Sequence, residues 1–149
     1  MDKNTIPNDE AIFPIRIAAK LLNISVHTLR KYERDGLIIP FKSPGNQRLF
    51  SNNDIIRINR IRNNINVKKI SINGLLALIS LIPCWKIKKC SDDERLICKA
   101  FKENLSPCWL YKHTDNICAT NDCRDCDVYK QNFDYENIRE TIRLFYGGR

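Results

Sequence analysis

Seven cysteines, the residues best suited to chemistry in this chain, all lie between Cys84 and Cys126. In reducing surroundings such clustering favours metal ligation or redox chemistry over structural disulfides. Cys123 and Cys126 have the C-x-x-C spacing of a chelating pair. So short a segment rarely builds a sufficient core, and a bound metal would stabilise it. The candidate metal ligands are Cys84, Cys90, Cys98, Cys108, Cys118, Cys123 and Cys126.

Two kinds of metal site fit these thiols. Zinc takes four ligands, and C-x-x-C spacing is ordinary for it. A [4Fe–4S] or [2Fe–2S] cluster also takes four cysteines and tolerates looser spacing. Trp85 and Trp109, each next to a cysteine, would shield a cluster from water, so an iron–sulfur cluster is slightly favoured over zinc. His113 is a further candidate, although a lone surface histidine is more common.

The cysteine segment contains two imperfect copies of one pattern. Each copy begins Pro-Cys-Trp and ends with Cys, a spacer, a small apolar residue and an aromatic ring. The copies span 83–101 and 107–129, with Cys90 inside the first and Cys118 and Cys123 inside the second. The pattern resembles a small bacterial module with two Cys-Trp pairs, found attached to sensory and regulatory proteins. That resemblance implies a shape but no particular cofactor.

The net charge of +8 is unevenly distributed. Residues 1–80 carry 13 Lys and Arg against 6 Asp and Glu, whereas residues 81–149 carry 12 against 11. The basic first half is therefore the expected surface for a polyanion such as DNA. There is no phosphate-binding loop, serine triad or plausible carboxylate pair, so we expect no enzyme. A thiol–disulfide enzyme using Cys123 and Cys126 is disfavoured because no βαβ pattern surrounds the pair.

Apolar residues at helical spacing predict the elements that position these basic groups. Helices are expected over 15–22 and 26–34, joined by a tight turn. Ser25 is a suitable N-cap for the second helix, and Gly36 provides the left-handed residue that commonly follows a helix. Two short helices around such a turn form a helix-turn-helix, whose second helix fits the DNA major groove.

A hairpin wing and two further helices are expected next. The wing joins β-like runs at 37–39 and 47–50 through a loop rich in turn formers, and places Lys42 and Arg48 to meet phosphates. Ser51, with Asp54 three residues on, caps a third helix. That helix carries isoleucines inward and three arginines outward: Arg57, Arg60 and Arg62. A strongly apolar fourth helix is expected over 71–81.

The run over 17–38 resembles the signature of MerR-family transcription regulators, "A-K-L-x-x-V-S-x-x-T-L-R-x-Y-E-x-x-G-L-[IL]". Residues 46–54 are similar to the family's wing, "[GN]-x-R-x-[YF]-S-x-x-D". The resemblance implies that the DNA backbone is touched by Arg30, Tyr32 and Arg48. It implies that the major groove is faced by His27, Thr28 and Lys31. The alternatives are that Tyr32 belongs to the core and that Arg30 is a solvated charge.

The chain departs from that family in one respect. Members usually dimerise through a long helix after the fourth one, where this sequence has Pro83 and the cysteines. A homodimer would have to form through the tail or through a final helix expected over 134–146. The seam between the two halves is placed between Ile82 and Pro83.

The expected fold is mainly α: a winged helix-turn-helix over 12–82, with four helices and a short β-hairpin wing, a loop-rich cysteine module over 83–129, and a C-terminal helix. The expected function is cytoplasmic, sequence-specific regulation of transcription on double-stranded DNA. A redox- or metal-responsive tail would modulate DNA affinity. The alternative is an architectural or excisionase-like DNA-binding protein with purely structural zinc. No run approaches the ~20 apolar residues of a membrane helix, so no membrane partner is expected.

Overall fold

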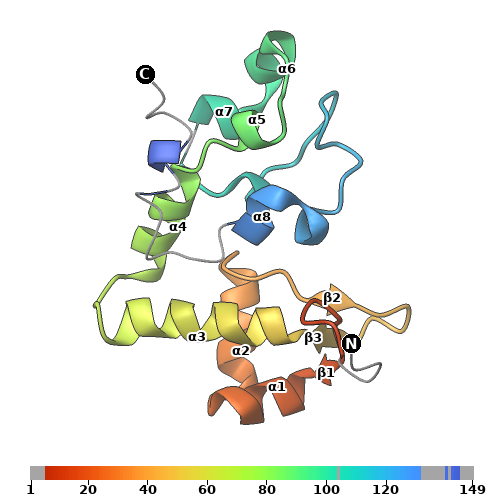
Figure 1. Cartoon of the computed structure of the whole chain (residues 1–149), viewed down its shortest axis with the longest axis vertical. Helices are drawn as coiled ribbons and strands as arrows, with labels where there is room; N and C mark the ends of the chain where they lie inside the picture. The colour runs from red at the N-terminus through yellow and green to blue at the C-terminus, as the bar shows by residue number, and fades with distance from the viewer. Residues whose placement is uncertain (1–5, 104, 132–139, 141, 145–149) are drawn as a thin grey trace. The chain divides into compact units, whose positions relative to one another are not determined.

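A computed structural model describes residues 6–103, 105–131, 140 and 142–144. The chain divides into two compact units, Met1–Asn63 and Asn64–Arg149 (Figure 1). Helices dominate, and the described residues form a single small antiparallel sheet, in the first unit. The predicted fold class, a mainly helical winged helix-turn-helix followed by a loop-rich cysteine module, is confirmed.

The helix-turn-helix forms as predicted. Helix α1 (Ile15–Leu22) is followed by helix α2 (Val26–Arg34). Asn23 turns the chain between them with a φ of 53°, a left-handed conformation that Asn tolerates well. The Ser25 hydroxyl accepts the Thr28 backbone N–H at 3.0 Å and so caps α2. The helices pack through buried Ala18, Ala19, Leu22 and Leu29.

The wing differs in part from its prediction. The sheet has the strand order β1 (Phe13–Pro14), β3 (Arg48–Phe50) and β2 (Phe41–Lys42), and β2 and β3 form the wing. The strand predicted over 37–39 is wrong, because Leu37 and Ile38 are 0% and 4% exposed and fill the core instead. The strand begins only after Pro40, which has no N–H to donate to a ladder. Strand β1, which was not predicted, pairs with β3.

Helix α3 (Asn52–Asn66) begins at the predicted cap. The Ser51 hydroxyl accepts the Asp54 N–H at 3.1 Å, and the Asp54 carboxylate accepts the Ser51 N–H at 2.7 Å. Two of its isoleucines, Ile58 and Ile61, are completely buried. The reciprocal cap therefore fixes the start of the helix that closes the core of the first unit.

The expectation that the arginines of α3 point outward is wrong for Arg57, which is only 2% exposed. Its Nε donates to the Leu37 carbonyl at 3.4 Å, so it supports the chain just after α2. Arg62 is half-buried, and its Nη1 donates to the Leu22 carbonyl at the end of α1, at 2.7 Å. Helical spacing alone assigned these side chains to solvent, whereas each one satisfies a backbone carbonyl of another segment.

The second unit is built of short helices. Helix α4 (Ile72–Ser80) has the Ser71 N-cap and closely matches its predicted span. The others are α5 (Cys84–Ile87), α6 (Asp92–Ile97), α7 (Lys99–Glu103), η1 (Cys108–Leu110), η2 (Cys123–Asp125) and α8 (Asp127–Gln131).

Helix α4 belongs to the same unit as the cysteines, although the sequence placed the seam after Ile82. Ile79 and Ile82 line one pocket with Ala100 and Val128 of the cysteine segment. The strongly apolar helix therefore supplies core that the short cysteine segment lacks.

Most of the helix predicted over 134–146 lies outside the described residues. Glu140 and residues 142–144 are described and are helical. Among the described helices, none is both long enough and apolar enough to span a membrane.

Candidate functional site

The outer face of α2 presents the residues that the sequence singled out for DNA. His27, Arg30 and Lys31 are exposed. Thr28 is half-buried, and its hydroxyl lies 2.9 Å from that of Ser25. The first turn of α2 therefore offers short polar groups, which is where a recognition helix approaches base edges.

Tyr32 lies on the other side of α2 and is only 7% exposed. Burial raises the pKa of its hydroxyl, and the positive charges of Arg62 and Lys31 partly oppose that rise. Its ring belongs to the core of the first unit, so any role toward DNA would fall to the hydroxyl alone.

The wing carries its two basic side chains opposite one another. Lys42 pairs with Arg48 in the register of β2 and β3. The Glu33 carboxylate of α2 accepts a hydrogen bond from Arg48 Nε, and its other oxygen lies 3.6 Å from Lys42 Nζ. Lys31, on the helix surface, forms a separate ion pair with Asp35 at 2.7 Å. Basic groups of α2 and of the wing thus lie in one unit, and Glu33 of α2 bridges the two cations of the wing.

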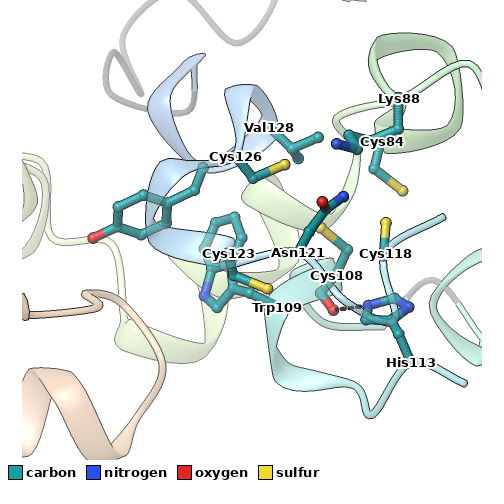
Figure 2. A pocket seen from close by; sticks show the side chains of 11 residues that line it. Cys84, Lys88, Cys108, Trp109, His113, Cys118, Asn121, Cys123, Cys126 and Val128 are labelled. Atoms are coloured by element: carbon teal, nitrogen blue, oxygen red, sulfur yellow. Dashed lines mark hydrogen bonds between the residues drawn. The ribbon is translucent and has the colours of Figure 1, made fainter.

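The cysteines gather around two adjoining pockets of the second unit. Figure 2 shows the first pocket, with thiols from separate segments around it. That pocket is lined by Cys84, Cys108, Cys118, Cys123 and Cys126. The second is lined by Cys84, Cys90, Cys98, Cys108 and Cys118. All seven predicted ligands are therefore brought to one region, and three of them border both pockets.

Matched positions of the two sequence copies have matched surroundings. Trp85 meets Phe101 edge to face at 5.0 Å and 89°, and Trp109 meets Tyr129 at 5.1 Å and 84°. The proline that opens each copy is completely buried. Cys90 and Cys118 each precede the final cysteine of their copy by eight residues. Cys123 has no counterpart in the first copy.

The first cysteines of the two copies, Cys84 and Cys108, contact each other through their thiols. The Cys108 thiol donates to Cys84, and this hydrogen bond lowers the pKa of Cys84 while it raises that of Cys108. Burial raises the pKa of Cys118 to about 12 and also raises those of Cys90 and Cys123. The pKa values of Cys90, Cys108, Cys118 and Cys123 are therefore raised, whereas that of Cys84 is lowered.

His113 lies at the edge of both pockets. Its Nε2 donates to the Cys108 carbonyl at 2.8 Å, which leaves Nδ1 as an acceptor. Asn116 donates to Nδ1 at 3.3 Å, and the Cys98 sulfur lies 3.9 Å from it. The histidine that the sequence considered as an extra ligand is thus hydrogen-bonded within the module.

The thiol set suits zinc or an iron–sulfur cluster by its chemistry, because both take four cysteine sulfurs. By geometry, no three His, Cys, Asp or Glu side chains in the described part of the chain are arranged so that they could hold a metal ion. Side-chain movement into the pockets would be needed to complete a four-sulfur site.

Sequence reasoning missed the role of Glu33. The available signal was an acidic residue in a recognition helix whose other charges were basic up to Arg34. Its partner Arg48 lies 15 residues away on the wing, and helical spacing says nothing about such a pair.

Comparison with known proteins finds relatives of the first unit. Residues 14–50 match the family described as "MerR family regulatory protein". The HTH-type transcriptional regulators GlnR of Bacillus anthracis and Bacillus cereus are each 39% identical over 51 residues, which are 34% of this chain and 40% of theirs. A Streptomyces coelicolor protein with the heat-shock name HspR is 29% identical over 76 residues, 51% of this chain and 50% of its own.

The chain therefore spans half or less of the length of these relatives, and no solved structure matches it significantly. The matched residues begin at Pro14, the last residue of β1, and contain α1, α2, β2 and β3. The N-terminal part of this chain is similar to the helix-turn-helix domain of MerR family regulators.

Proposed function

We propose that the protein is a sequence-specific DNA-binding transcription regulator whose recognition helix and wing contact one DNA duplex. The observation that carries the proposal is the set of exposed basic and polar groups on α2 beside the basic wing, within one MerR-family domain. His27, Thr28 and Lys31 would face base edges. Arg30, Lys42 and Arg48, together with the Tyr32 hydroxyl, would contact phosphates.

The test is binding of the full chain to an operator that is first selected from fragmented genomic DNA. Replacing Arg30 or Arg48 by alanine should weaken binding by about 10- to 100-fold, the loss of a charge-assisted contact. Each variant should also reduce the salt slope by roughly 0.9 per phosphate contact. Lys112→Ala removes the same charge from an exposed site in the second unit and serves as the control. Unchanged binding by both arginine variants would contradict the proposal.

A second part of the proposal concerns the cysteine module. The module would hold a metal, and a change in its redox state or metal content would change the affinity of the protein for DNA. Support comes from the seven thiols around two pockets and from the aromatic rings of Trp85 and Trp109 beside them. The chain's own part is to supply thiolate ligands and to exclude water. An iron–sulfur cluster stays slightly favoured over zinc.

Anaerobic purification followed by an absorption spectrum and by iron, zinc and acid-labile sulfide analysis tests this part. Iron and sulfide, with DNA affinity that changes on exposure to air, would support a cluster-based sensor. Colourless protein with about one firmly held zinc and unchanged affinity would favour the architectural alternative with structural zinc. A homodimer would place two recognition helices about 34 Å apart on the operator, and sedimentation with and without DNA tests that stoichiometry.

A further inference from the structure

A single carboxylate connects the recognition helix with both strands of the wing. Glu33 lies near the end of α2, and its two oxygens face Arg48 Nε and Lys42 Nζ. These two cations are directly opposite each other in the β2–β3 register. Like charges directly opposite destabilise a strand pair, so a carboxylate between them stabilises the wing.

The three charges are layered by exposure. The Glu33 side chain is 18% exposed, that of Arg48 31% and that of Lys42 52%. An approaching polyanion therefore meets the cations before it meets the carboxylate. The carboxylate acts on the polyanion mainly through the cations that it holds.

The Arg48 guanidinium can donate hydrogen bonds to Glu33 and to a phosphate group at the same time. A guanidinium carries five N–H donors in a rigid, planar fork. Among the described residues, Arg48 donates a hydrogen bond through Nε to the Glu33 carboxylate. The Nη donors keep their capacity for phosphate oxygens, and the bond at Nε fixes the plane in which they are presented.

We infer that Glu33 is a positioning residue for DNA binding, which orients Arg48 and Lys42 for phosphate contact although its own charge repels DNA. This inference rests on the proposed function. It predicts that removing the Glu33 carboxylate weakens DNA binding, whereas the change in net charge alone predicts stronger binding. Removing one carboxylate raises the net charge by one, which by itself strengthens binding to a polyanion. Loss of the orienting contact weakens it.

The experiment compares the wild-type chain, Glu33→Gln and Asp9→Asn on the selected operator at fixed salt. Asp9 is a matched control, because it is an exposed carboxylate of the same unit and its replacement changes the net charge by the same amount. Glu33→Gln should bind about tenfold more weakly, the equivalent of one charge-assisted hydrogen bond. Asp9→Asn should bind as tightly as the wild type or more tightly. Binding by Glu33→Gln that equals or exceeds that of Asp9→Asn would overturn the inference.

A double-mutant cycle separates positioning from general support of the fold. In an Arg48→Ala background, Glu33→Gln should have little further effect, because its main target is already gone. Fully additive losses would show that Glu33 acts elsewhere and would refute the assignment. The proposed function fails differently: in that case the wild type shows no salt-dependent preference for any genomic fragment, and Arg48→Ala changes nothing.

Discussion

Arg62→Ala should loosen helix α1 selectively. Arg62 Nη1 donates to the Leu22 carbonyl at 2.7 Å, across 40 residues of sequence. Leu22 is the last residue of α1, and such a carbonyl lacks a partner inside its own helix. A hydrogen bond from a charged donor contributes about 1.5–3 kcal/mol, and a cation at a helix C-terminus about 0.3–1 kcal/mol. Because the contact is only part-buried, we expect a loss of about 2 kcal/mol.

Amide hydrogen exchange, measured on peptides from α1, reports this loss because exchange becomes faster when the helix opens locally more often. A loss of about 2 kcal/mol corresponds to roughly 30-fold faster exchange. Asn59→Ala, at an exposed position of the same helix α3, controls for the change to alanine. Equal exchange of α1 in Arg62→Ala and wild type, or equal acceleration by Asn59→Ala, would refute the reasoning.

Three further predictions follow from buried rings and thiols. Burial raises the pKa of Tyr32 in the folded state, so the unfolded chain ionises first and the unfolding free energy should fall above about pH 10. Urea titrations at pH 8 and 10.5 should show a smaller fall in Tyr32→Phe, and an equal fall would contradict the assignment. In reduced, metal-depleted protein, iodoacetamide should label Cys84, whose pKa is lowered, at lower pH than Cys118, whose pKa is about 12. Peptide mass spectrometry that finds Cys118 labelled first would rule this out. Trp85→Leu and Trp109→Leu should each lose the ~1 kcal/mol of an edge-to-face pair and lower stability by similar amounts, and clearly unequal urea midpoints would contradict their equivalence.

The helices of the first unit could be predicted because their signals are local. Ser25 and Ser51 cap the helices that the sequence assigned to them. The basic residues of α2 and the wing could also be chosen from spacing and from resemblance. Capping and apolar periodicity act over three or four residues, which is the range that a single sequence makes visible.

Features that depend on partners far along the chain could not be predicted. Strand β1 pairs Phe13 with Phe50, and the buried Arg57 donates to the Leu37 carbonyl. The 37–39 run was β-like in composition, yet the core of the unit took those side chains. In the cysteine half, residue types pointed to thiol chemistry, but only the fold could show which thiols border which pocket.

The unmatched cysteine of the second copy has a consequence for oxidation. Disulfides consume thiols two at a time, so a chain with seven can close at most three bonds within itself. Six thiols have counterparts across the two copies, and Cys123 stands outside that correspondence. However the six are arranged, exhaustive oxidation leaves one sulfur that can react only with another molecule. Because the number of cysteines is odd, each fully oxidised chain keeps one thiol that can form a disulfide with a second molecule. A module with two identical copies would have an even number and no such thiol.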